Sequence, residues 1–193
     1  MKKLSSMMMI ALAALAFQAC NNSAKDSKET ADSVNEVKDT TTTGATGIAV
    51  DEGDAKFTTT AASDGMAEIA LAKLAQEKST NTDVKSFAAM MITDHEKAAA
   101  ELSAIAETKN ITLPSAPTEE QQKMQADLTA KKGADFDKAY IDGMVKAHEN
   151  AVSLFDDASK NCKDADLKAF ATKTLPTLKA HETHVKSVQK KLK

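Results

Sequence analysis

Four ionisable side chains occupy positions within apolar helical patterns, where they could form either a metal site or a buried polar network. They are Glu68, His95, His148 and His181. The apolar residues around each one recur at intervals of three and four, which is the pattern of a buried helix face. Imidazole nitrogens and carboxylates are common ligands of zinc, iron and copper in proteins. In the alternative, the imidazoles form hydrogen bonds to Glu68, Tyr140 or water in a structural polar layer.

The depth of these four residues favours a shared site. If the turns near residues 80 and 162 lie at the same end of a bundle, the four residues stand roughly 12 to 19 residues from that end, or about 18 to 28 Å at the rise of an α-helix. They can therefore occupy one layer near the middle of the bundle. We predict that one divalent transition-metal ion (zinc, iron or copper) binds there.

Three residues beside this layer each have two interpretations. Asp94, next to His95, either accepts a hydrogen bond from the neighbouring helix or faces water, and the pattern favours water. Gly65 and Gly143 stand inside expected helices, where glycine costs about 1 kcal/mol relative to alanine. Close helix approach or room for a ligand would justify that cost, and chance explains it equally well.

The spacing known from bundle enzymes is absent. Di-iron carboxylate proteins carry a glutamate three residues before a ligating histidine. The residues three positions before the inward histidines are Ile92, Val145 and Leu178. His181 and His184 are one residue short of the zinc-protease spacing, and His184 is interpreted equally well as a solvated neighbour. The sequence also has no phosphate-binding loop and no nucleophile elbow, so it names no reaction and favours a protein that is not an enzyme.

From about residue 54 the chain has the composition of helices, with few β-branched runs. The expected long helices cover 55–78, 82–109, 135–160 and 164–192. A capping box at Thr118 predicts a short helix that ends near residue 131, and Pro176 should kink the last helix. The expected fold is all-α: a ferritin-like antiparallel four-helix bundle with an extra short helix between the second and third long helices.

The start of the chain predicts export. A basic beginning, the uncharged run from Met7 to Phe17 and then Cys20 are typical of a bacterial lipoprotein signal peptide over residues 1–19, with Cys20 as the lipidated residue. An ordinary secretory signal is the alternative. Residues 20–53 are polar and predict a disordered tether, and residues 54–193 form the bundle domain. We therefore expect a protein of the periplasm or outer membrane that meets the membrane through its lipid.

The composition excludes several kinds of partner. All 25 basic residues are lysines, tryptophan is absent and the net charge is −3. Arginine is the residue best suited to bidentate phosphate recognition, and no basic tract with interleaved aromatic residues occurs. Nucleic acid is therefore not an expected partner. With Cys20 lipidated, Cys162 is the single remaining cysteine and no intramolecular disulfide can form.

Three stretches carry a family resemblance: MAEIALAKLAQEKSTNTDVKSFAAMMITDHEKAAAELSAIA, ADFDKAYIDGMVKAHENAVSLF and LKAFATKTLPTLKAHETHV. They resemble the bacterial domain of unknown function DUF4142, often described as a predicted outer-membrane protein, from about Phe57 to Val188. The family's pattern falls on Glu68, Asp94, His95, Phe136, Asp137, Tyr140, His148, Leu175, Pro176 and His181. The resemblance implies a bundle similar to ferritin and brings no established activity.

Three functions stay open on this basis. The leading hypothesis is a non-enzymatic, lipid-anchored envelope protein whose Glu/His layer binds a metal ion. The first rival is a structural or interaction lipoprotein in which the layer fixes only the register of the helices. The second is a ferritin-like oxidative-stress enzyme, which the missing Glu-x-x-His spacing disfavours.

Overall fold

The computed structural model describes residues 26–40 and 48–192, and this part of the chain is all helical, with no strand. Its six helices are α1 (Ser27–Thr40), α2 (Glu52–Lys78), α3 (Thr82–Thr108), α4 (Glu119–Ala130), α5 (Gly133–Asn161) and α6 (Ala165–Lys191). Within the described ranges, no helix has the length and apolar character needed to cross a membrane. Cys20 and the expected signal peptide lie outside the described residues.

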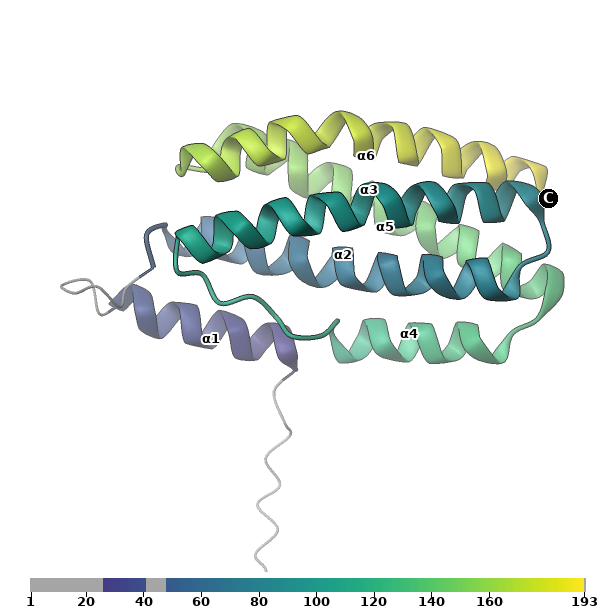
Figure 1. Cartoon of the computed structure of the whole chain (residues 1–193), viewed down its shortest axis with the longest axis horizontal. Helices are drawn as coiled ribbons and strands as arrows, with labels where there is room; N and C mark the ends of the chain where they lie inside the picture. The colour runs from purple at the N-terminus through teal and green to yellow at the C-terminus, as the bar shows by residue number, and fades with distance from the viewer. Residues whose placement is uncertain (1–25, 41–47, 193) are drawn as a thin grey trace, which may run out of the picture.

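The four long helices pack side by side along one axis (Figure 1). The α2–α3 and α5–α6 connections are each three residues long, so both pairs are antiparallel hairpins. Asp51, Asn81 and Asp164 cap α2, α3 and α6, because each side chain accepts backbone N–H groups from the first turn of its helix. The expected long helices are thus confirmed to within three residues at each end. Pro176 lies inside α6, which continues on both sides of it.

The short helix between the second and third long helices is also confirmed. Thr118 and Gln121 form a capping box at the start of α4, in which each side chain accepts a hydrogen bond from the other residue's backbone N–H. Helix α4 lies against α2 and α5. In Figure 1 it follows α1 along the same side of α2, so these two shorter helices form an outer layer on the bundle.

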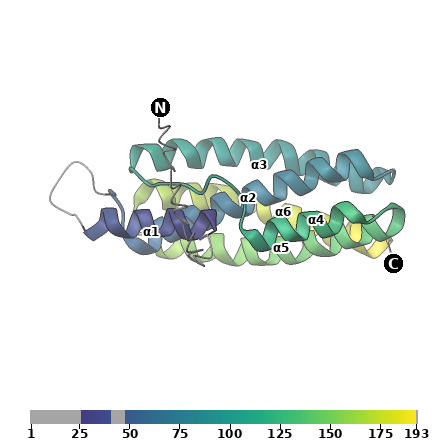
Figure 2. The same ribbon diagram turned by 90° about the horizontal axis from the view of Figure 1, so that it is seen from below.

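The prediction of a disordered tether over residues 20–53 is wrong for α1 and for the start of α2. Helix α1 packs along α2 (Figure 2), and Ala31 and Asn35 are buried at 2% and 3% exposure. The Asn35 amide donates to the Thr112 carbonyl (2.9 Å) and accepts from the Thr112 N–H (2.8 Å). This helix is held by polar bonds to a loop rather than by an apolar face. The sequence of α1 therefore lacks the apolar pattern that would predict a packed helix.

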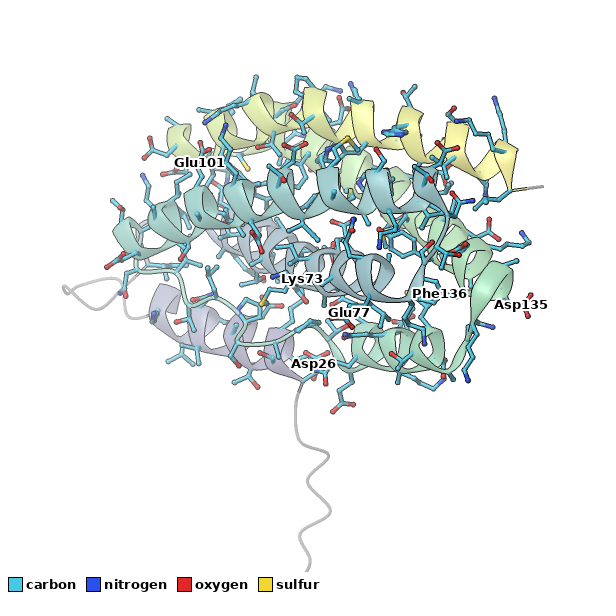
Figure 3. The ribbon with its side chains drawn as sticks, turned by 45° about the vertical axis from the view of Figure 1, so that its right-hand side comes forward. Asp26, Lys73, Glu77, Glu101, Asp135 and Phe136 are labelled. Carbon is cyan, nitrogen blue, oxygen red and sulfur yellow. The ribbon has the colours of Figure 1, made fainter. Side chains whose placement is uncertain are left out.

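Charged side chains cover the outer surface of the long helices (Figure 3). Lys73 on α2 pairs with Glu96 on α3 at 2.8 Å, and Lys173 on α6 pairs with Glu101 on α3 at 2.8 Å. Exposed pairs of this kind contribute little to stability, on the order of 0–1 kcal/mol each. They mark the solvent side of each helix and leave the polar residues inside to be explained separately.

The apolar core consists of two clusters with a polar layer between them. On α2, residues Ala55 to Ala61 belong to the first cluster and Leu71 to Ala75 to the second, and Glu68 lies between these segments. The other three long helices also pass from one cluster to the other, α6 in the same order and α3 and α5 in the reverse order. On each of them the residue between the clusters is a histidine: His95 on α3, His148 on α5 and His181 on α6.

The premise that the turns near residues 80 and 162 lie at the same end is wrong, because Ala75 and Val84 beside the first turn belong to the second cluster and Cys162 beside the other belongs to the first (Figure 1). The four ionisable groups still share one level of the bundle, because each lies near the middle of its helix.

Candidate metal centre

Each long helix contributes one buried ionisable side chain to this layer. The exposed fractions are 5% for Glu68, 7% for His95, 0% for His148 and 1% for His181. The three ring centroids are 5.4 to 5.8 Å apart. One ligand atom from each ring lies within 4.8 Å of those of the other two. Three imidazoles thus converge on one point without coming into hydrogen-bond contact with each other.

One nitrogen of each imidazole bonds outward, to a different acceptor. His95 Nδ1 is 3.1 Å from Glu68 Oε2, and His181 Nε2 is 2.9 Å from Asp94 Oδ2. His148 Nδ1 is 2.9 Å from the carbonyl oxygen of Met144, one turn earlier on the same helix. A carbonyl can only accept, so the hydrogen of His148 is on Nδ1. The Asp94 carboxylate likewise accepts from His181 Nε2–H, and the Glu68 carboxyl, which keeps an accepting carbonyl oxygen even when protonated, accepts from His95 Nδ1–H.

The second nitrogen of each imidazole is buried and has no hydrogen-bond partner among the described residues. These atoms are His95 Nε2, His148 Nε2 and His181 Nδ1. With the hydrogens on the outward nitrogens, each inward nitrogen carries a lone pair. A ligating histidine characteristically donates its other N–H to a carboxylate or a backbone carbonyl, which fixes the tautomer and the ring orientation. All three imidazoles have this arrangement.

Burial keeps two of the imidazoles, His95 and His148, neutral. Desolvation lowers the pKa of His95 to about 3, and the neighbouring His148 and His181 lower it further. Desolvation likewise lowers the pKa of His148 to about 4, against the opposing effect of its bond to Met144. Neutral imidazole is the form that binds metal, so these two rings need not lose a proton at neutral pH.

Glu68 is shifted in the opposite direction. Burial, and to a smaller extent the nearby Asp64, raises the pKa of Glu68 to about 8. The metal-free layer therefore favours the neutral acid at this position. A cation beside it would favour the carboxylate, because a nearby positive charge lowers the pKa of an acid. The charge of Glu68 is thus coupled to whatever occupies the centre.

The profile of the domain of unknown function DUF4142 matches residues 39–188. The chain belongs to the DUF4142 family. This confirms the resemblance seen in the sequence, and the match also covers the end of α1. No curated relative matches the chain at a significant level.

Two solved structures share the helical fold of this DUF4142 protein. A DUF305 fragment from Deinococcus radiodurans has a TM-score of 0.65 at 13% identity, covering 74% of this chain and 98% of the fragment. CopM, solved in its Cu(II)-bound form, has a TM-score of 0.63 at 17% identity, covering 72% of this chain and 97% of CopM. At these identities the likeness concerns the fold alone.

The layer contains all four residues that the sequence singled out, but their positions differ. The three histidines form the group whose atoms converge, and Glu68 lies behind His95, with its other oxygen 3.7 Å from His148 Nδ1. Asp94 does not merely face water, as the pattern favoured: its side chain is 39% exposed and reaches His181 on α6. His184 lies outside the group and packs against Phe87, with the ring centroids 5.6 Å apart.

One contact of this centre has no sequence signal. The acceptor for His148 is the backbone carbonyl of Met144, and any residue type at that position would supply the same oxygen. The possible hydrogen bond from an imidazole to Tyr140 is not found. The buried Tyr140 hydroxyl has no hydrogen bond within the described part of the chain.

Proposed function

We propose that this protein binds one divalent transition-metal ion through His95 Nε2, His148 Nε2 and His181 Nδ1. The observation that carries the proposal is the set of three buried lone pairs aimed at one point, each on a ring whose other nitrogen is held from behind. A buried polar atom without a partner costs about 1–3 kcal/mol. A single bound cation would satisfy all three atoms at once, whereas a purely structural layer would be expected to pair them with each other or with nearby hydroxyls.

The charge of the surroundings supports a divalent ion. Three neutral imidazoles add no charge, and the carboxylates of Glu68 and Asp94 behind His95 and His181 would balance two positive charges. Imidazole ligands suit copper, zinc, iron and nickel, and among divalent first-row ions copper binds most tightly. We therefore rank Cu(II) first and zinc second, with iron third. CopM, which shares the fold, was solved with Cu(II) bound.

In this proposal Glu68 is a positioning residue rather than a ligand. Its carboxylate holds the His95 ring by Nδ1, as Asp94 holds the His181 ring by Nε2. Such partners orient the ring and raise the basicity of the ligating nitrogen. The order of the helices, with a long connection from α3 to α5, supports a ferritin-like layout, but a di-iron reaction lacks its Glu-x-x-His spacing.

We further infer a place in the bacterial envelope. The support is the lipoprotein-like start of the chain, with Cys20 as the residue that would carry the lipid. A lipid on Cys20 would keep the metal-binding bundle at a membrane surface, in the periplasm or on the outer membrane.

Metal titration of chelator-stripped protein tests the proposal. The informative variants remove one inward nitrogen and keep an outward donor: His95→Asn and His148→Asn, whose amide replaces Nδ1, and His181→Gln, whose amide replaces Nε2. His184→Asn is the matched control, because His184 lies outside the converging group. Calorimetry with Cu(II) and with zinc should give one site per chain in the parent and in the control.

Each of the three variants should lose about tenfold or more in affinity, since each loses a ligating nitrogen. Two results would overturn the proposal. One is a parent protein that binds no ion with a stoichiometry of one. The other is a loss of affinity in His184→Asn equal to that in the three variants of the layer.

A further inference from the structure

A cavity of about 210 Å³ adjoins the three-histidine centre. His95 and His181, with Glu68 and Asp94 behind them, lie at its polar end. The remaining wall is largely apolar and includes Leu102, Phe155, Phe170 and Leu178. Leu113 and Pro114, from the segment between α3 and α4, complete it. The cavity thus places two imidazoles of the centre beside a space suited to hydrocarbon.

The cavity occupies one side of the polar layer. On α2 and α6 its lining residues precede Glu68 and His181, and on α3 and α5 they follow His95 and the position of His148. His148 itself does not line it. The other side of the layer is filled by side chains that are almost fully buried, among them Phe87, Met91 and Tyr140. We call the cavity side the open side of the centre, because His95 and His181 border the cavity there instead of packed side chains.

Small residues create the space. Ala61, Ala98 and Ala151 line the cavity from three helices, and Gly65 lines it one turn before Glu68. A Cβ atom at Gly65 would meet no atom within 4 Å. Close approach of a neighbouring helix therefore does not explain this glycine. The absence of a side chain at Gly65 instead leaves space beside the centre.

The size and charge of the cavity define the molecule that fits. A dry cavity of about 150 Å³ already accommodates benzene, so about 210 Å³ takes a somewhat larger body. With a divalent ion bound, the carboxylates of Glu68 and Asp94 balance its two charges, so a neutral molecule leaves the buried centre without net charge. A fourth ligand on the open side would need one lone pair, as an aromatic nitrogen or a thioether sulfur provides.

We propose that this cavity binds a small, neutral, mostly apolar molecule with one nitrogen or sulfur donor atom, placed at the open side of the three-histidine centre. The part of the proposal that concerns the donor atom rests on the proposed metal site. The part that concerns the apolar body rests on the cavity alone. The two parts are tested separately.

The first experiment uses metal-free protein and toluene. Toluene should raise the melting temperature of the parent, because the cavity takes up an apolar ring without a metal. Gly65→Leu places a side chain in the cavity and should abolish the shift, and Ala98→Leu does the same from α3. Gly143→Leu is the matched control, since Gly143 is also a mid-helix glycine with no atom within 4 Å but does not line the cavity. A parent that toluene does not shift, or an equal shift in all four proteins, would overturn the apolar part.

The second experiment uses Cu(II)-loaded protein with imidazole and 4-phenylimidazole, followed by the visible absorption of copper. Both probes share the donor, and one adds an apolar ring. The ring should improve binding about tenfold or more in the parent and in Gly143→Leu, and the gain should disappear in Gly65→Leu. Equal binding of both probes to the parent would refute the joint site. If the protein takes up no copper, the proposed metal function fails, while the toluene result still decides whether the cavity binds an apolar molecule.

Discussion

Acidification of the metal-free protein should lower its stability through the buried histidines. Their folded-state pKa values, about 3 for His95 and about 4 for His148, lie below the ordinary value of 6.5. Below pH 6.5 each of these histidines is therefore protonated in the unfolded chain but stays neutral in the folded chain. The free energy of unfolding decreases as the pH falls. Between pH 6.5 and 5.0 the two groups together should remove about 3 kcal/mol from the free energy of unfolding.

Glu68 opposes this loss, because its shift has the other sign. Its folded-state pKa of about 8 lies above the ordinary value of 4.5. The folded protein therefore holds a proton that the unfolded chain releases, and stability is gained as the pH falls from 8 toward 4.5. Over the same interval from pH 6.5 to 5.0 this gain is about 2 kcal/mol. The parent should thus lose about 1 kcal/mol, and Glu68→Gln, which cannot titrate, should lose about 3 kcal/mol.

Urea unfolding followed by circular dichroism, at pH 6.5 and 5.0 and with chelator present, measures both values. The slope of the denaturation curve should stay the same, so that the difference reports stability rather than a change in the unfolded state. Equal losses in the parent and in Glu68→Gln would show that Glu68 does not hold a proton in the fold. A variant whose stability is unchanged by acidification would show that His95 and His148 are not kept neutral.

Three further outcomes are expected. Cu(II) at a hundred times its dissociation constant should stabilise the fold by about 2.7 kcal/mol, and a melting curve that does not move in the parent would contradict the site. Asn35→Ala should cost about 1–3 kcal/mol in urea unfolding, because it leaves the backbone of Thr112 without both its bonds to α1, whereas Val37→Ala, at a 64% exposed position, should cost little. Cys20→Ser should remove fatty-acid label and release the protein from membranes, and equal labelling of both proteins would defeat the lipid anchor.

The helices and the polar layer could be predicted from the sequence. Helix periodicity places His95, His148 and His181 on inward faces, and each of them lies near the middle of a long helix. In long helices packed side by side, those two facts bring four ionisable groups to one level, although the turns at 79–81 and 162–164 lie at opposite ends of the bundle and not at the same end. The capping box at Thr118 marks the start of α4 in the sequence, because a side-chain acceptor before a helix leaves a local signal.

Contacts that depend on the direction of side chains between helices could not be predicted from the sequence. Asp94 lies about 100° round α3 from His95, and only the tilt and rotation of α6 bring His181 to it. The same holds for Glu68, whose pattern does not distinguish a ligand from a residue that holds His95. Helix α1 was not predicted for another reason. Asn35 binds it to backbone atoms of Thr112, and a backbone partner leaves no signal in the sequence.

X-ray absorption on the Cu(II)-loaded protein tests the central claim most directly, because it counts the atoms around the ion. The arrangement of His95, His148 and His181 predicts three imidazole nitrogens at about 2.0 Å, with the outer-ring scattering that marks histidine. His184→Asn should leave this count at three, and His148→Asn should lower it to two. A coordination shell made mainly of oxygens, or three imidazoles that persist in His148→Asn, would contradict the three-histidine centre.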